Sequence, residues 1–235
     1  DRLHAVLEAV GEAGPYVVSE LLQGETLRVT TARGPMPPRR AVDLAMQIAA
    51  GLGEMGARVL LSARKADELE QACAALGAQG VDAGWIAADG ALDADVARLA
   101  EEAIERLGHV DILVNNAGAT WGAAAEVHPV EAWDKVMNLN IRGVFLLTQA
   151  IGKASMIPRQ YGRIVNVASI AGLLGNPPEL MHTIAYNTSK GALVNFTRAL
   201  ACEWGRYNIT VNALAPGFFP SKMTKGALPQ FGAGA

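Results

Sequence analysis

The sequence has 235 residues, of which 51% are hydrophobic and 18% charged, and its formal net charge is -3 at pH 7. This length and apolar content suffice for one sizeable core, and the small negative charge argues against a nucleic-acid-binding protein. Its two cysteines, Cys73 and Cys202, are too few for a disulfide scaffold, and no apolar run reaches the roughly 18 residues that cross a bilayer. A cytoplasmic protein without membrane contact is predicted.

The first 52 residues differ in pattern from the rest of the chain. Residues 14–27 and 33–52 resemble the hinge and following helices of bacterial serine/threonine protein kinases. No Gly-rich loop precedes them and no His-Arg-Asp or Asp-Phe-Gly motif follows, so the parts of a kinase that bind magnesium and phosphates are absent. We interpret residues 1–52 as a foreign or spliced segment that is not a complete domain, and residues 53–235 as the principal domain.

From residue 53 onward, short apolar runs alternate with longer amphipathic ones. The short runs predict strands at residues 58–62, 83–88, 111–115, 163–168 and 209–214. Apolar residues at three- and four-residue spacing predict helices at 66–76, 94–107, 133–155 and 185–207. Strands that alternate with helices predict an α/β fold with a doubly wound parallel sheet and right-handed crossovers.

Tyr186 and Lys190 lie one helical turn apart in the last predicted helix, so the phenol and the ammonium are neighbours. A cation close to a phenol lowers its pKa from about 10 by roughly one to three units. The strand at 163–168 leads directly to Ser169, and the carboxyl ends of parallel strands line active sites. These side chains predict a proton donor opposite a hydroxyl.

Three further runs accompany this pair: an apolar strand and small-residue turn at 111–118, a helix start at 138–143, and residues 212–217. Together the motifs resemble the short-chain dehydrogenase/reductase family, from residue 53 to residue 235. The resemblance implies a Rossmann-type sheet, a nicotinamide cofactor and the interconversion of a carbonyl and a secondary alcohol. Within the family, the sequence looks like the branch with gluconate 5-dehydrogenase-like enzymes and 3-oxoacyl-carrier-protein reductases.

The resemblance also implies a catalytic tetrad of Asn140, Ser169, Tyr186 and Lys190. Ser169 would donate a hydrogen bond to the substrate carbonyl, and Tyr186 would protonate the developing alkoxide. Lys190 would lower the pKa of the tyrosine and hold the nicotinamide ribose. Asn140 would hold a water that connects the lysine to solvent.

Residues after the predicted strands are candidates for cofactor binding. Arg64 and Lys65 stand where an NAD enzyme of the family usually has an acid, so they favour NADP(H) over NAD(H). The alternative is a solvated basic turn. The resemblance places further residues at the adenine (Asp89), the adenosine side (Asn115, Ala117, Gly118) and the nicotinamide (Pro216, Gly217, Ser221). The alternative role of Asn115 is to tie the strand to its turn.

The family's first strand and its Thr-Gly-x-x-x-Gly-x-Gly turn should precede the helix that ends near Gly56, and the sequence has no such turn. Its glycines let backbone amides approach a pyrophosphate. Residues 26–34 combine a β-prone stretch with small residues and would fill the central strand position and turn. The family's last strand would follow residue 235. A sheet truncated at both ends is therefore expected, and a non-catalytic fragment that binds no dinucleotide is the alternative function.

The four histidines show no metal-ligand spacing, so no metal site is predicted, and His182 is expected to line the substrate mouth. In the last helix Leu193, Phe196, Leu200 and Trp204 form an apolar stripe that faces the sheet or another subunit. Because family members pair through their two long helices, a homodimer or homotetramer is expected. The expected partner is a small carbonyl or alcohol, with neither nucleic acid nor membrane.

Overall fold

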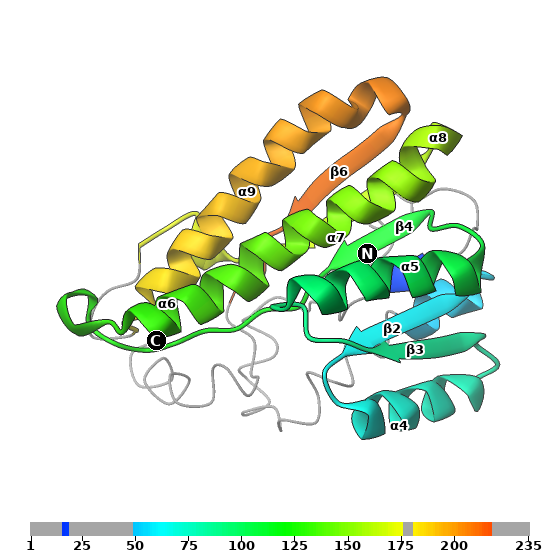
Figure 1. Cartoon of the computed structure of the whole chain (residues 1–235), viewed down its shortest axis with the longest axis horizontal. Coiled ribbons are helices and arrows are strands. Elements are labelled where there is room, and N and C mark those ends of the chain that lie inside the picture. Colours follow the sequence, from blue (N-terminus) through cyan, green and yellow to red (C-terminus); the bar gives the residue numbers. More distant parts are fainter. Residues whose placement is uncertain (1–15, 19–48, 176–180, 218–235) are drawn as a thin grey trace.

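The computed structural model describes residues 16–18, 49–175 and 181–217 (Figure 1). These residues form a six-stranded parallel sheet in the order β3-β2-β1-β4-β5-β6. The strands are β1 (Tyr16–Val18), β2 (Val59–Ala63), β3 (Ala83–Ala87), β4 (Ile112–Asn115), β5 (Gly162–Val167) and β6 (Ile209–Leu214). The five strands after residue 53 and the predicted Rossmann-type fold class are confirmed.

The helices also follow the predicted pattern, with boundaries that shift by a few residues. The region predicted as one helix at 133–155 is a continuous helical rod over residues 130–159, and two wider π-helical turns, η2 and η3, interrupt it. The elements are α4 (Ala66–Gly77), α5 (Asp93–Leu107), α6 (Val130–Met137), η2 (Asn138–Gly143), α7 (Val144–Ile151), η3 (Gly152–Met156), α8 (Ile157–Arg159) and α9 (Ile184–Trp204). In Figure 1 this rod and α9 lie side by side.

Alternate residues of each central strand enter two different cores, as a doubly wound sheet requires. Val59, Leu61 and Val114 pack with α4 and with the helix that ends at Glu54. Leu60 and Leu113 pack on the other face with α5, the rod and α9. In the apolar stripe of α9, Leu193 and Leu200 are buried, and Phe196 and Trp204 pack against this second core. The stripe therefore faces the sheet.

The central strand is not the one that the sequence analysis expected. β1 lies between β2 and β4, with Val17 opposite both Leu60 and Leu113. Residues 26–34 lie outside the described residues, and the position proposed for them belongs to Tyr16–Val18. That expectation was wrong because a short aromatic and β-branched run fits a buried parallel strand wherever it occurs in a sequence. Part of the kinase-like segment thus completes the sheet.

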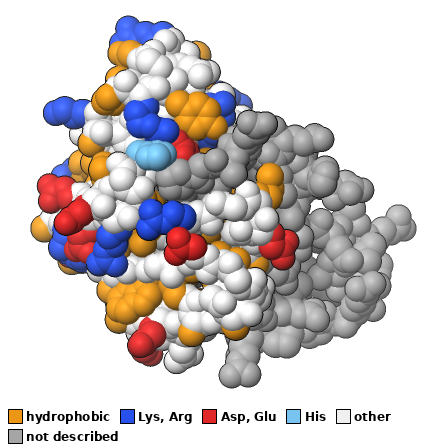
Figure 2. Space-filling view, turned by 90° about the vertical axis from the view of Figure 1, so that its right-hand side faces the viewer, with side chains coloured by type: hydrophobic (Ala, Val, Ile, Leu, Met, Phe, Trp, Pro, Cys, Tyr) orange, Lys and Arg blue, Asp and Glu red, His pale blue; other side chains and the backbone are white. Residues whose placement is uncertain are grey.

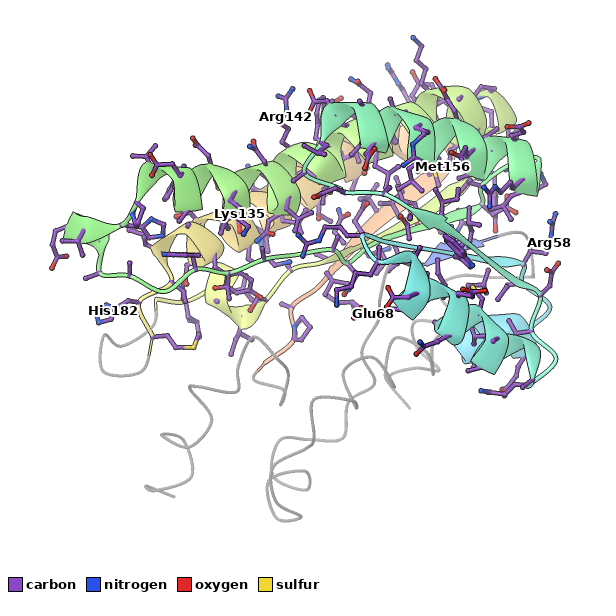
Figure 3. All side chains as sticks on the ribbon, turned by 60° about the horizontal axis from the view of Figure 1, so that its bottom comes forward. Arg58, Glu68, Lys135, Arg142, Met156 and His182 are labelled. Carbon is purple, nitrogen blue, oxygen red and sulfur yellow. The ribbon has the colours of Figure 1, made fainter. Side chains whose placement is uncertain are left out.

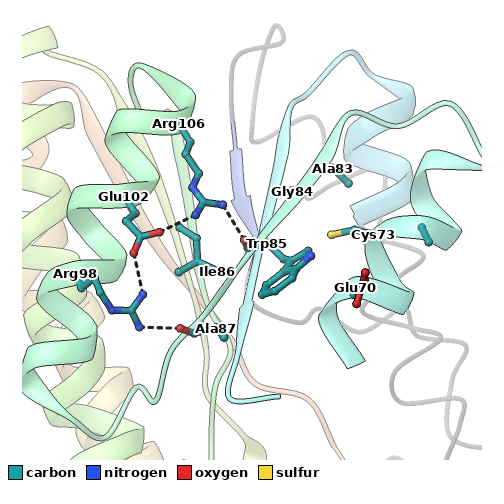
Figure 4. Close-up of a pocket in the computed structure, with 11 residues that line it drawn as sticks. Glu70, Cys73, Ala83, Gly84, Trp85, Ile86, Ala87, Arg98, Glu102 and Arg106 are labelled. Atoms are coloured by element: carbon teal, nitrogen blue, oxygen red, sulfur yellow. Dashed lines mark hydrogen bonds and ion pairs between the residues drawn. The ribbon is translucent and has the colours of Figure 1, made fainter. Parts of the chain in front are cut away.

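The free edge of the sheet at β3 is bordered by a hollow of about 760 Å³ (Figure 4). Arg106 donates to the carbonyl of Trp85 (3.0 Å) and Arg98 to that of Ala87 (2.7 Å). Glu102 accepts from both guanidiniums and holds them in place. Because these two carbonyls of β3 are bound by arginines, they are not available to an added strand.

Ion pairs cover the opposite end of the sheet from the carboxyl ends of the strands. Arg58 pairs with Asp82 (3.0 Å), and Arg159 and His109 both contact Asp111. Figure 2 shows positive and negative side chains interspersed over this end of the molecule. Among the described side chains visible there, neither sign predominates.

Gly143 in η2 permits the rod to touch the loop after β3. A Cβ at this position would lie 1.9 Å from the carbonyl oxygen of Gly90, which is backbone and cannot rotate away. We expect Gly143→Ala to lower the free energy of unfolding by about 1–3 kcal/mol. Gly205, where a Cβ meets nothing within 4 Å, supplies the matched control. Urea unfolding measures both variants, and equal stabilities for Gly143→Ala and Gly205→Ala would contradict this packing.

Candidate active site

The carboxyl ends of β4, β5 and β6 meet the first turns of α9, and Ser169, Tyr186 and Lys190 come together there. Ser169 follows β5; its hydroxyl accepts from the backbone N–H of Ala171 (3.1 Å) and lies close enough to the phenol of Tyr186 to influence the pKa of that phenol. The turn η4 (Ile170–Gly172) then packs against α9 so closely that a Cβ on Gly172 would lie 2.5 Å from the carbonyl carbon of Lys190. Glycine at this position brings the serine strand and the tyrosine helix into contact.

Lys190 is almost completely buried, with 3% of its surface exposed. Its Nζ donates to the carbonyl of Val167 at 2.6 Å and lies 5.7 Å from the ring centroid of Tyr186. Burial disfavours the charged form, and this lowers the pKa of Lys190 to about 8. The ammonium is therefore directed at the end of β5, above the face of the phenol ring.

The pKa of Tyr186 does not follow the prediction. Burial raises the pKa of this phenol above its ordinary value, and the hydrogen bond with Ser169 acts in the opposite direction but is the smaller effect. The lowered pKa expected from Lys190 is wrong because the Nζ faces the ring and the Val167 carbonyl. The sequence gives the spacing of the two side chains but not their burial.

Asn140 joins the loop after β4 to α9. It lies in the π-helical turn η2 and is fully buried. Its Oδ1 accepts from the backbone N–H of Ala119 (2.7 Å), and its Nδ2 donates to the Ala119 carbonyl and to Ser189 Oγ, both at 2.9 Å. Ser189 in turn donates to the carbonyl of Tyr186. The amide of Asn140 thus fixes the loop that faces the tyrosine.

A second buried network lies beneath the site. Asn115 Nδ2 donates to Thr148 Oγ1 and to Asn166 Oδ1, and Asn166 Nδ2 donates to Thr197 Oγ1, all at 2.9 Å. The network joins β4, β5, the rod and α9. Both N–H groups of the Asn115 side chain are used in this network. This favours the alternative in which Asn115 fixes its strand over a role in cofactor binding. The sequence analysis missed Thr148, Asn166 and Thr197, although an asparagine inside an apolar strand is a signal for such a network.

The other candidate cofactor residues lie along the same edge of the sheet. Arg64 and Lys65 follow β2 and are exposed; Lys65 pairs with Glu68 at 2.5 Å, which raises the pKa of the lysine. Asp89 follows β3, and its carboxylate accepts from the backbone N–H of Ala91 (3.0 Å). Ala117 and Gly118 are exposed after β4.

The last candidate cofactor residues follow β6. Pro216 and Gly217 follow the strand, and the carbonyl of Pro216 accepts from the N–H of Ile170, just after the serine. Ser221 lies outside the described residues. Five of the six strands, all except β1, therefore present predicted site residues at their carboxyl ends, at the same end of the sheet.

The described half of this edge suits a nicotinamide dinucleotide. The Lys190 ammonium has three N–H groups and donates one to Val167, so it retains donors for a ribose diol. Gly118 leaves the approach to that ammonium open, because a Cβ there would lie 3.5 Å from Lys190 Nζ. Residues 19–48 lie outside the described residues.

His182 lies in the loop that precedes α9 (Figure 3). It is exposed, and its carbonyl accepts from the N–H of Ala123 at 2.9 Å, which joins this loop to the loop after β4. Within the described residues, no three His, Cys, Asp or Glu side chains gather as metal ligands.

No helix among the described residues is both long enough and apolar enough to cross a bilayer.

A family described as short chain dehydrogenase matches residues 43–230, and the chain belongs to this oxidoreductase family. The match begins before the predicted boundary at residue 52. The chain is 37% identical over 183 residues to gluconate 5-dehydrogenase of Gluconobacter oxydans, covering 77% of this chain and 69% of that protein. It is 40% identical over 185 residues to the rhamnolipids biosynthesis 3-oxoacyl-[acyl-carrier-protein] reductase of Pseudomonas aeruginosa, covering 77% and 71%.

Solved structures show the same likeness. Actinorhodin polyketide ketoreductase with NADPH superposes with a TM-score of 0.76 at 32% identity, covering 95% of this chain and 76% of that one. NAD+-bound xylitol dehydrogenase gives a TM-score of 0.69 at 34% identity, covering 74% and 65%. This chain therefore spans about two thirds of the length of the xylitol dehydrogenase.

The buried lysine makes stability depend on pH. Burial lowers the pKa of Lys190 from 10.5 to about 8, so between these values the unfolded chain holds a proton that the folded chain has released. The free energy of unfolding should then rise as pH increases from about 8 to 10, by about 2–3 kcal/mol. The raised pKa of Tyr186 acts in the opposite direction only above pH 10.

Denaturant unfolding of Lys190→Met should lack this rise, whereas Lys153→Met, at an exposed lysine of the rod, should keep it. A pH dependence that is the same in both variants would show that Lys190 is charged in the folded state throughout this range.

Proposed function

We propose that the chain is an NADP(H)-dependent oxidoreductase that interconverts a carbonyl and a secondary alcohol, with a 3-oxoacyl thioester or a sugar acid as substrate. The observation that carries the proposal is that the turn after Ser169 packs against the helix of Tyr186 and Lys190, with the buried Lys190 Nζ 5.7 Å from the Tyr186 ring, at the carboxyl ends of the strands. The names of the two relatives above support both substrate types. The homo-oligomer and the cytoplasmic location belong to the same proposal and are predictions.

The roles of the side chains follow from their contacts. A carbonyl oxygen placed between the Ser169 hydroxyl and the Tyr186 phenol receives a hydrogen bond from each. Because its pKa is raised, Tyr186 is protonated at neutral pH and transfers its proton to that oxygen as negative charge develops there. The bound nicotinamide supplies the hydride. Lys190 holds positive charge close to the phenol, and this charge stabilises the phenolate that remains.

Arg64 and Lys65 support NADP(H) as the cofactor. A 2′-phosphate accepts charge-assisted hydrogen bonds from a guanidinium, and the exposed Arg64 lies at the end of the strand next to β1. Structures named above hold either NADPH or NAD+, so the fold itself does not decide between them.

The second candidate function is a fragment without catalysis. The sequence lacks the Gly-rich turn that approaches the pyrophosphate in the family, and this absence favours it. The two candidates differ in a single measurable property, which is saturable binding of a dinucleotide.

Fluorescence titration separates them. We expect a Kd for NADPH near micromolar, corresponding to about -8 kcal/mol, and NADH binding at least about tenfold weaker. Arg64→Gln should weaken NADPH binding by about tenfold and leave NADH binding within about twofold, because only NADPH carries the phosphate. Arg58→Gln, at an exposed arginine paired with Asp82, is the matched control and should change neither. Failure to bind at millimolar NADPH would support the fragment.

A second prediction tests the proton donor. Tyr186→Phe removes the transferable proton and should lower kcat for NADPH-dependent carbonyl reduction by about 10²–10⁴-fold, while the Kd for NADPH changes little. Tyr207→Phe, at a half-buried tyrosine of η5 (Gly205–Tyr207), is the control and should retain full turnover. Steady-state turnover by Tyr186→Phe close to that of the control would rule out this donor.

A further inference from the structure

Three loops are joined by hydrogen bonds beside the first turn of α9, the turn that carries Tyr186. They are residues 119–124 after β4, residues 169–175 after β5, and residues 181–184 before α9. The N–H of Ala123 donates to the carbonyl of His182 (2.9 Å), and Asn187 Nδ2 donates to the carbonyl of Leu174 (3.4 Å). Asn140 holds Ala119 from beneath. We call these three segments the mouth of the site.

The mouth exposes large apolar side chains. Trp121 is 45% exposed, Leu173 54%, Leu174 67% and Ile184 42%. These are four of the nine large hydrophobic side chains that are exposed among the described residues. Exposed apolar side chains that gather within a few short segments usually mark a binding surface, whereas single ones carry no meaning. Here they adjoin the pair that would receive the carbonyl.

The mouth also lacks charge. Residues 119–124, 169–175 and 181–184 contain no Lys, Arg, Asp or Glu, and His182 is their only histidine. A carboxylate that leaves water for this surface would lose hydration without gaining a cation from the mouth, which is unfavourable. An aliphatic chain would gain from burial against Trp121, Leu173 and Leu174. The mouth therefore suits an uncharged apolar substrate.

We propose that the substrate is a 3-oxo compound with an aliphatic acyl chain, whose chain lies on Trp121, Leu173 and Leu174, and that sugar acids are disfavoured. This inference rests on the proposed oxidoreductase function and decides between its two substrate types. In the reaction, hydride passes from NADPH to the carbonyl carbon and the Tyr186 proton passes to the oxygen. The products are the 3-hydroxyacyl compound and NADP+, and solvent reprotonates the tyrosine.

Turnover measures the chain-length preference directly. With NADPH, kcat/KM for ethyl 3-oxoalkanoates should rise with each added methylene, by up to about fourfold per group, and should exceed that for 5-keto-D-gluconate. Leu173→Gln should flatten this rise. Leu92→Gln, the same substitution at a leucine 57% exposed near α5, should leave the rise unchanged. A kcat/KM that is independent of chain length, or highest for the keto-gluconate, overturns the proposal.

A binding measurement tests the mouth independently of turnover. In the presence of NADP+, calorimetry should show that octanoyl-N-acetylcysteamine binds at least tenfold more tightly than gluconate, and that Leu173→Gln removes most of this difference. Equal affinities, or tighter binding of gluconate, overturn the apolar mouth. If the octanoyl thioester binds as expected but no carbonyl is reduced, the proposed function fails and the apolar mouth stands.

Light scattering tests whether a second subunit, rather than substrate, covers these apolar side chains. If Leu173→Gln changes the oligomeric state of the chain and leaves octanoyl binding intact, the apolar residues form a contact between subunits, and the proposal is overturned.

Discussion

The site depends on the close contact between η4 and α9. A Cβ on Gly172 would meet the backbone of Lys190 at 2.5 Å, and one on Gly191 would lie 3.3 Å from the Gly172 carbonyl. Two glycines thus let the turn that follows Ser169 lie directly against the helix that carries Tyr186 and Lys190. The contact buries the ammonium of Lys190, and this burial lowers its pKa to about 8. A bulkier residue would separate the two elements and with them the serine and the tyrosine.

Buried amides then fix the remaining parts of the site relative to this contact. Asn140 connects the loop after β4 to α9, and the Asn115–Asn166 network connects β4 and β5 to the helices behind them. Leaving a buried amide without its hydrogen-bond partners would cost about 1–3 kcal/mol. Arrangements of these side chains that break the network are therefore disfavoured. These amides therefore attach the site to strands and helices of the core.

The sequence predicted the regular elements well because their apolar periodicity reflects the cores directly, as the alternation of Leu60 and Leu61 between two cores illustrates. It also brought Ser169, Tyr186 and Lys190 to one place through the resemblance to the family. It placed the central strand wrongly, because the pairing of Val17 with Leu60 and Leu113 is a long-range contact that no local pattern encodes. The predicted lowering of the Tyr186 pKa was wrong for a related reason. Spacing along a helix shows that a cation is near the phenol, but it does not show that burial affects the pKa more than the cation does.

The two shifted pKa values determine which groups of the site are protonated at neutral pH. At neutral pH the Tyr186 phenol is protonated and most of the Lys190 ammonium is charged, since its pKa is about 8. This is the state required to donate a proton to a carbonyl oxygen, whereas oxidation of an alcohol requires the phenolate, which burial disfavours. An apolar chain on Trp121 and Leu173 would exclude further water from the same phenol and strengthen this effect. Burial of the pair and an apolar chain in the mouth would both keep the phenol protonated until a carbonyl oxygen accepts its proton, and the charge on Lys190 would then stabilise the phenolate that remains.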